Sequence, residues 1–182
     1  IGWSISGGFD IDGRERGYAS YRVIGGDYFR AMGVPLKRGR LFEPSDRSGT
    51  PHVVVVNESA AEKHWSGMDP IGQRIRIRGM DLHRDDWLTV VGVVGDVHHR
   101  GLAAPADAEV YVSFMQRPER MRDGTTMVIR TSSDPALLST AVRDRIRAID
   151  PDIPSSVRTY QEVVMASVPV ASSRWIPAPN TF

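Results

Sequence analysis

The sequence contains no cysteine, which excludes disulfide bonds, thiolate nucleophiles and cysteine metal ligands. It also has little excess charge of either sign: 23 lysine and arginine residues against 22 aspartate and glutamate residues give a formal net charge of +1. A chain this close to neutrality exerts no long-range attraction on nucleic acid or anionic lipid, so we expect no nucleic-acid partner. No apolar run approaches the roughly 18 residues that a membrane-spanning helix needs.

Several motifs of enzymes are missing as well. The sequence has no dinucleotide-binding G-x-G-x-x-G followed by a helix, no phosphate-binding G-x-x-x-x-G-K-[ST] and no G-x-S-x-G nucleophile elbow. We therefore expect a protein that is not an enzyme, with no catalytic residues and no cofactor. The chain starts at Ile1 without a methionine or a signal sequence, and we expect it to be a segment of a longer protein.

What is present is an ordinary globular composition. The 182 residues are 41% hydrophobic and 25% charged, enough for one domain or for two small lobes.

The clearest local pattern lies between residues 52 and 97. The run Val-Val-Val-Val-Asn at 53–57 predicts a buried strand, and Asn57 can accept a hydrogen bond as the N-cap of a helix over 58–65. Isoleucine and arginine alternate at 73–78, which predicts a strand with one buried face, and the nearly continuous apolar run at 87–97 predicts another buried strand.

Strands and helices also alternate on both sides of this segment. Residues 1–17 are rich in glycine, and we expect at most a frayed edge strand there. Residue types and alternation predict further strands at 18–24, 36–42, 109–114, 126–131 and 156–160. Helices are expected at 27–32, 134–150 and 161–166, the second of them begun by Asp134 and Pro135. The pattern predicts an α+β (mixed α/β) protein with helices packed on sheet faces.

One cluster has the residue types of a metal site. Asp96, His98 and His99 close the strand at 87–97, and imidazole and carboxylate groups suit zinc or another divalent ion. Adjacent histidines at a strand end point to opposite sides, so at most one of them joins Asp96. We favour polar residues closing a strand, and keep as an alternative a divalent-metal hydrolase that uses Asp96 with His98 or His99 and Glu109.

Arg74, Arg76 and Arg78 form a one-sided basic ladder with Ile75 and Ile77 between them. A half-solvated strand explains this pattern better than a patch for an anion or a partner. A further alternative function is a sensor that binds a small ligand in a cleft between two lobes.

An ordered set of short motifs resembles the extracytoplasmic core domain of MacB/FtsX-type ABC transporter permeases, and within it the duplicated-permease branch. Each motif is weak alone, and their order over residues 18 to 165 makes the set specific. The motifs are YFRAMGVP at 28–35, GRLF at 39–42, Asp46, VVVNESAA at 54–61, DPIG at 69–72, VVGVVGDV at 90–97 and VYV at 110–112.

The resemblance implies two lobes. Residues 1–48 and 119–166 would form a porter-like lobe of two βαβ halves, residues 49–118 an inserted sabre-like lobe, and residues 167–182 a flexible tail. In this arrangement we expect the strand of Tyr21 to pair with the segment near Val128, and both chain ends to emerge on one side of the fold.

The resemblance also implies a function and a location. Such a domain passes the conformational change driven by a cytoplasmic ATPase subunit to substrates or partner proteins outside the membrane. It would lie on the periplasmic side of a bacterial inner membrane, tethered by transmembrane helices of its own permease that are outside this segment.

Overall fold

The computed structural model describes residues 4–11, 15–78, 86–99, 104–118 and 125–167. The chain divides into two compact units, the first ending at Arg130 and the second beginning at Thr131, and each is described by itself.

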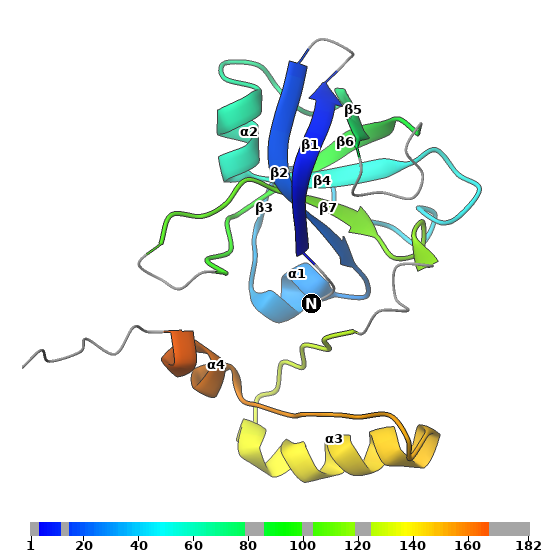
Figure 1. Ribbon diagram of the computed structural model, residues 1–182, viewed down its shortest axis with the longest axis vertical. Helices are drawn as coiled ribbons and strands as arrows, with labels where there is room; N and C mark the ends of the chain where they lie inside the picture. The colour runs from blue at the N-terminus through cyan, green and yellow to red at the C-terminus, as the bar shows by residue number, and fades with distance from the viewer. Residues whose placement is uncertain (1–3, 12–14, 79–85, 100–103, 119–124, 168–182) are drawn as a thin grey trace, which may run out of the picture. The chain divides into compact units, whose positions relative to one another are not determined.

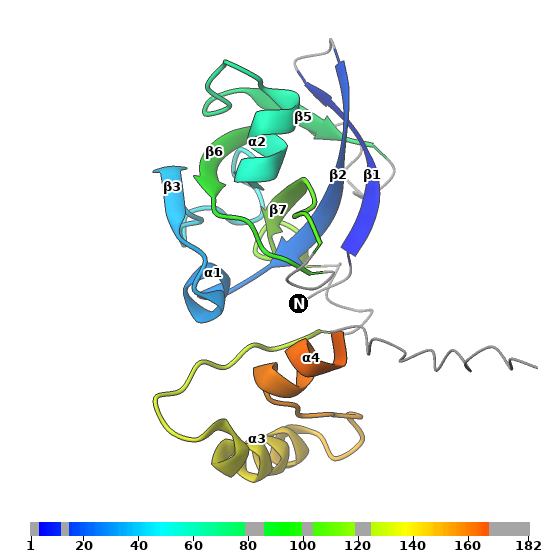
Figure 2. The same ribbon diagram turned by 90° about the vertical axis from the view of Figure 1, so that its left-hand side faces the viewer.

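Seven strands of the first unit form one mixed sheet that closes on itself (Figure 1). The strands are β1 (Ser4–Ile11), β2 (Glu15–Ile24), β3 (Leu36–Gly39), β4 (Val53–Asn57), β5 (Arg74–Ile77), β6 (Leu88–Val94) and β7 (Glu109–Ser113). Their order is β3-β6-β4-β7-β2-β1-β5, and β5 also pairs with β6. Six strands therefore make a closed ring, and β3 is added outside it as an edge strand beside β6 (Figure 2).

The hairpin of β1 and β2 is longer than the sequence suggested. Every residue of β1 has a partner on β2, and Phe9 to Ile11 also pair with Ile77 to Ile75 of β5. The expectation of a frayed edge strand was wrong: β1 is paired along its whole length, and Gly17 serves packing, since a Cβ there would overlap the ring of Phe9, which is fully buried. Glycine thus weakens the alternation in the sequence while it makes room for an aromatic side chain across the hairpin.

The predicted strand and helix at 53–65 are confirmed. All five residues of β4 are buried, because Val54 and Val56 face the cluster that includes α2 (Glu58–His64), while Val55 faces the cluster that includes α1 (Tyr28–Met32). A strand covered on both faces needs a continuous apolar run rather than an alternating one. The side chain of Asn57 accepts from the amide of Ala60 at 2.9 Å, as a helix N-cap does.

The two-faced strand at 73–78 is confirmed too, with Ile75 and Ile77 buried and Arg74 exposed. The strand expected at 36–42 ends earlier, at Gly39. There the chain crosses closely over β6: the amide of Arg40 donates to the carbonyl oxygen of Val91 at 2.9 Å, and a Cβ on Gly92 would overlap the carbonyl oxygen of Arg40.

The second unit contains α3 (Pro135–Ile149) and α4 (Tyr160–Ser167). The side chain of Asp134 accepts from the amide of Ala136 at 2.9 Å, so this helix begins where the sequence predicted. The strands expected at 126–131 and 156–160 were wrong, since neither segment pairs with another strand in the part of the chain that the structure describes. Strand-forming residue types do not make a strand without a neighbour to complete its hydrogen bonds. Except for Ser167, the expected tail lies outside the described residues.

These pairings correct part of the predicted fold. The α+β class is confirmed. The late βαβ half is wrong because it has helices without strands, and Tyr21 of β2 lies opposite Val110 of β7 instead of near Val128. The predicted boundary after residue 48 does not separate two sheets, since β2 and β3 belong to the same sheet as β4 to β7. The discontinuous porter-like lobe itself remains a prediction. Among the described residues, no helix is long and apolar enough to cross a membrane.

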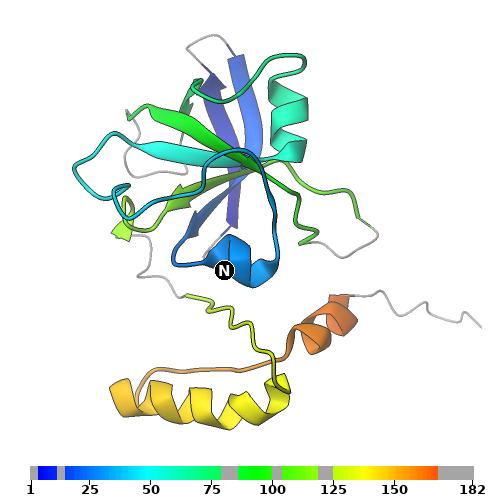
Figure 3. The same cartoon turned by 180° about the vertical axis from the view of Figure 1, so that it is seen from behind.

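The first unit is entered and left at one end of the sheet. Ser4, the first described residue, lies opposite Arg22, close to where β2 ends beside α1. At the other end of this unit, Nε of Arg130 donates to the carbonyl oxygen of Ala31 in α1 at 2.8 Å. Figure 3 shows α1 at this end, away from the α2 end of the ring. Both connections therefore lie at the end that α1 occupies.

Candidate functional site

A buried ionic centre lies between β2, β7 and the loop after β6. Nε of Arg22 lies 2.6 Å from Oε1 of Glu109, and His99 Nε2 lies 3.4 Å from the same oxygen. The hydroxyl of Tyr111 donates to the second carboxylate oxygen of Glu109. The side chain of Glu109 is fully buried, so its charge is balanced entirely by these neighbours.

The neighbours also set the protonation of this centre. Burial alone would raise the pKa of Glu109, but the adjacent His99 imidazole, the hydrogen bond from Tyr111 and the charge of Arg22 outweigh it and lower the pKa. Burial and the adjacent Glu109 carboxylate both raise the pKa of Tyr111, so its hydroxyl stays protonated. The centre therefore holds a carboxylate anion, a guanidinium cation and a neutral phenol.

Asn57 connects this centre to the start of α2. Its Oδ1 accepts from the amide of Glu109 at 2.8 Å as well as from Ala60, and its Nδ2 donates to the carbonyl oxygen of Asp107 at 2.7 Å. One amide side chain thus fixes β4, β7 and α2 relative to one another.

The candidate metal ligands are held apart by other partners. Asp96 accepts from the amide of Ser59 at 3.0 Å and from its hydroxyl at 2.7 Å, so its carboxylate stabilises the first turn of α2. His98 Nδ1 lies 2.8 Å from the carbonyl oxygen of Ala104, and only His99 joins Glu109. The part of the chain that the structure describes contains no group of three or more residues able to hold a metal ion.

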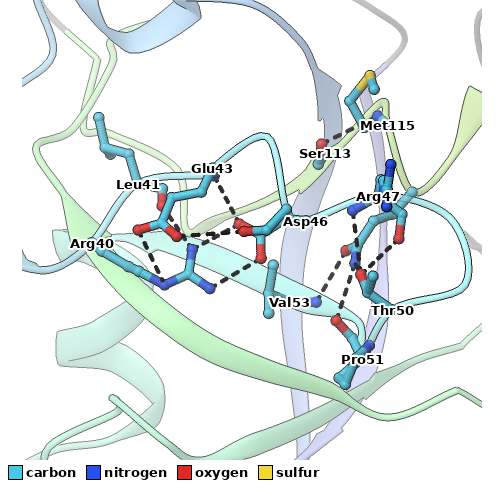
Figure 4. Close-up of polar contacts among 12 residues, drawn as sticks. Arg40, Leu41, Glu43, Asp46, Arg47, Thr50, Pro51, Val53, Ser113 and Met115 are labelled. Carbon is cyan, nitrogen blue, oxygen red and sulfur yellow. Dashed lines mark hydrogen bonds and ion pairs between the residues drawn. The ribbon is translucent and has the colours of Figure 1, made fainter.

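A second polar network fixes the loop between β3 and β4 (Figure 4). The guanidinium of Arg40 binds both carboxylate oxygens of Asp46, at 2.7 and 3.0 Å, and the amide of Glu43 also donates to Asp46. Burial alone would raise the pKa of Asp46, but the bonds from Arg40 and Glu43 lower it. A bidentate guanidinium and carboxylate pair sets orientation as well as distance, so this loop is held in one geometry.

The other end of the same loop is tied to the end of β7. The side chain of Gln116 accepts from the amide of Val53 at 3.1 Å and donates to Thr50 Oγ1 and to the carbonyl oxygen of Pro51. The amide of Ser48 donates to the carbonyl oxygen of Met115. The exposed loop is thus hydrogen-bonded to the sheet at this end as well.

The basic ladder of β5 is partly neutralised. Arg76 and Arg78 donate to the carboxylate of Asp10 on β1 at 2.9 and 2.6 Å, and the guanidinium groups of Arg74 and Arg76 each lie 5.1 Å from the ring centre of Trp87. This arrangement supports the interpretation of a half-solvated strand.

Sequence reasoning missed the ionic centre and the loop network. Arg22 and Glu109 are 87 positions apart, and only the parallel pairing of β2 with β7 brings them together. The alternation of Arg22 with Tyr21 and Val23 was a usable sign, because it places a charged side chain on the opposite face of a buried strand.

These networks hold strands and loops in place. Their chemistry is that of a rigid scaffold whose buried charges are paired.

Comparison with known proteins agrees with this picture. Residues 4–149 match the family described as the MacB-like periplasmic core domain. The macrolide export ATP-binding/permease protein MacB of Agrobacterium fabrum is 32% identical over 130 residues, which are 68% of this chain and 19% of that protein. The protein of the same name from Neisseria gonorrhoeae is 36% identical over 76 residues, 42% of this chain and 11% of that protein. The chain thus spans less than a fifth of the length of these relatives.

Two solved structures share the fold. The periplasmic region of MacB from Actinobacillus actinomycetemcomitans superposes with a TM-score of 0.59 at 21% identity, covering 81% of this chain and 64% of that one. The extracellular domain of the noncanonic ABC-type transporter YknZ from Gram-positive bacteria gives 0.53 at 18% identity, covering 80% and 73%. The chain belongs to the MacB-like periplasmic core domain family, and is the non-catalytic domain of an ABC transporter permease that lies outside the cytoplasm.

Proposed function

We propose that this domain transmits conformational change from the membrane helices of its permease to a substrate or partner protein outside the membrane. One observation carries the proposal: the described chain enters and leaves a closed sheet at the same end, beside α1. A body held at one end by two connections rotates when those connections move relative to each other.

The polar networks support this role because they make the body stiff. The buried centre joins β2 to β7, Asn57 joins β4 and β7 to α2, and Gln116 joins the loop before β4 to the end of β7. Paired charges and satisfied amides in a closed sheet resist internal deformation, so movement at the α1 end reaches the opposite end.

The partners proposed for the whole protein are its own transmembrane helices, a cytoplasmic ATPase subunit and an extracytoplasmic partner protein, at a bacterial inner membrane. The relatives named above as ATP-binding/permease proteins support the ATPase. We also assign the chain to the duplicated-permease branch, on the motif set between residues 28 and 112. The metal hydrolase and the small-ligand sensor are not favoured by any contact among the described residues.

The porter-like lobe of 1–48 with 119–166, around an inserted lobe of 49–118, remains part of the proposal. Its support is α3, an amphipathic helix with no fully buried residue, since an apolar stripe of this kind needs a surface to cover it. If the lobe exists, amide hydrogen exchange in α3 should be slower in this chain than in the isolated segment 131–167. Equal exchange rates would contradict it.

The test of this transmission uses the full transporter with a fluorescent donor in the domain and an acceptor in its membrane helices. ATP should change the energy transfer between them, and a flexible Gly-Ser insertion after Thr131 should abolish this change while ATP hydrolysis continues. The same insertion after Gly67, in the exposed turn that follows α2 and outside the polar networks named above, is the control and should leave the change intact. An ATP-dependent change that survives the insertion after Thr131 would overturn the proposal.

A further inference from the structure

The first unit ends at a contact between Arg130 and α1. Nε of Arg130 donates to the carbonyl oxygen of Ala31 at 2.8 Å, although the two residues are 99 positions apart in the sequence. Thr131, the next residue, already belongs to the second unit. The contact therefore holds the last residue of the first unit against α1, at the point where the chain leaves that unit.

The end of α1 has room for the guanidinium. The helix ends at Gly33, whose φ of 71° is left-handed backbone that favours glycine, and the amide of Val34 donates back to the carbonyl oxygen of Phe29 at 2.8 Å. A Cβ on Gly33 would lie 2.8 Å from Nη2 of Arg130, so the guanidinium occupies space that a side chain would need. The carbonyl oxygen of Ala31 is one of the last in the helix, where a cation is favourable.

The buried face of α1 connects this contact to the sheet. The ring centres of Tyr28 and Phe29 lie 6.2 and 5.1 Å from that of Tyr111 on β7. All three rings belong to a buried cluster that also includes residues of β2, β4 and β6. The hydroxyl of Tyr111 donates to Glu109 in the buried ionic centre. A continuous series of contacts thus runs from Arg130 through α1 to that centre.

The two parts of this series differ in strength. Tyr28 and Phe29 are buried against the sheet, whereas Arg130 is exposed. A charge at an exposed helix end changes an equilibrium by only about two- to fivefold. The contact of Arg130 can therefore open and close while α1 and the sheet stay folded.

We propose that Arg130 is a releasable clamp between the first unit and the chain that follows it. When Arg130 binds the end of α1, movement of the chain from Thr131 onward is passed to α1 and the sheet. When it is released, the chain moves without them. This inference deepens the proposed transmission and rests on it, because it names the residue that couples the first unit to the connection after it.

The first experiment measures backbone order parameters by ¹⁵N relaxation in the isotope-labelled chain. Arg130→Gln should lower the order parameters of residues 125–130 and leave those of α1 and the strands unchanged. Arg147→Gln is the matched control, because it removes the same charge from a highly exposed side chain in α3, and should leave residues 125–130 unchanged. Unchanged order parameters at 125–130 in Arg130→Gln, or equal decreases in both variants, would overturn the proposal.

Two glycines distinguish the clamp from general backbone strain. Gly33 and Gly26 both have positive φ, 71° and 58°, so alanine is strained at either position, but a Cβ on Gly26 would meet no atom within 4 Å. In the Gly26→Ala background, Arg130→Gln should raise the equilibrium constant for urea unfolding of the first unit about two- to fivefold. In the Gly33→Ala background it should have no effect, because the added Cβ has already displaced the guanidinium. Equal effects in the two backgrounds would overturn the clamp.

The last experiment places the same variants in the full transporter with the donor and acceptor described above. Arg130→Gln should reduce the ATP-dependent change in energy transfer while ATP hydrolysis continues, and Arg147→Gln should not. A change of full size in Arg130→Gln would overturn the clamp and leave the transmission intact. No change in the unmodified transporter would contradict the transmission alone, since the order parameters and the glycine backgrounds test the clamp without a membrane or ATP.

Discussion

Arg22 and Glu109 form an ion pair inside the sheet, with 2.6 Å between Nε and Oε1 and side-chain exposures of 8% and 0%. The parallel pairing of β2 with β7 places Arg22 opposite Tyr111, whose hydroxyl binds the same carboxylate. Because both charges are removed from water, each depends on the other for its stability.

Replacing one partner should therefore cost far more than breaking a surface pair. Arg22→Met leaves the Glu109 carboxylate buried without its cation, and we expect the free energy of unfolding to fall by about 3–5 kcal/mol. Urea unfolding followed by circular dichroism measures this loss. Arg30→Met is the control, since Arg30 and Asp27 are both highly exposed and 3.9 Å apart, and should cost no more than about 1 kcal/mol. Similar losses for the two variants would contradict the paired burial of Arg22 and Glu109.

The same carboxylate predicts how stability depends on pH. The pKa of Glu109 is lower in the folded chain than its ordinary value of 4.5, because hydrogen bonds and Arg22 outweigh the effect of burial. The unfolded chain then binds a proton more readily at this group. The contribution of Glu109 to the free energy of unfolding is therefore fully present above pH 4.5 and is lost as the pH falls through the lower folded pKa.

Unfolding by urea at a series of acidic pH values should show this decline, and Glu109→Gln should make it shallower because the titrating group is gone. Asp46, whose pKa is lowered by Arg40 and Glu43 against the effect of burial, contributes in the same direction and leaves a residual slope. Parallel profiles for the two proteins would show that Glu109 does not carry the effect.

Local patterns predicted the parts of the fold that local physics decides. The apolar run of β4 and the cap at Asn57 depend on neighbouring residues, and both were found from the sequence. For β1 the sequence predicted at most a frayed edge strand, because glycine disfavours strands. Gly17 instead accommodates the ring of Phe9 in the hairpin. The strand expected near Val128 is not formed. Residue types alone do not show whether a segment has a neighbouring strand to pair with, because that depends on the arrangement of the whole sheet.

The candidate site was less predictable than the fold. Ion pairs such as Arg22 with Glu109 and Arg76 with Asp10 join residues far apart in the sequence, and their partners follow from strand order alone. Conversely, residues close in the sequence need not form one site. Asp96 and His98 are near neighbours, yet Asp96 stabilises α2 and His98 contacts the carbonyl oxygen of Ala104.

The close approach of Arg40, just after β3, to β6 predicts a strong effect at Gly92. A Cβ there would overlap the carbonyl oxygen of Arg40, which is backbone and cannot move aside alone. We expect Gly92→Ala to lower the free energy of unfolding by about 1–3 kcal/mol, as overpacking does. Gly8→Ala is the control within another strand, since its nearest atom would be 3.8 Å away, and should stay within about 1 kcal/mol of the unmodified chain. Equal urea midpoints for both variants would show that the backbone of Arg40 does not lie this close to Gly92.

The contacts of Asp96 distinguish a structural role from a metal site. Because its carboxylate accepts from the amide and the hydroxyl of Ser59, Asp96→Ala should destabilise the start of α2 by about 0.5–2 kcal/mol. The loss should be the same with added zinc, with added manganese and with a chelator, and neither ion should raise the melting temperature of the unmodified chain. Asp150→Ala is the control, since its side chain accepts an amide hydrogen bond from Asp152 in an exposed turn after α3, and should have a smaller effect. If a metal ion raised the melting temperature of the unmodified chain but not that of Asp96→Ala, Asp96 would be a ligand, and the assignment of its carboxylate to Ser59 would be wrong.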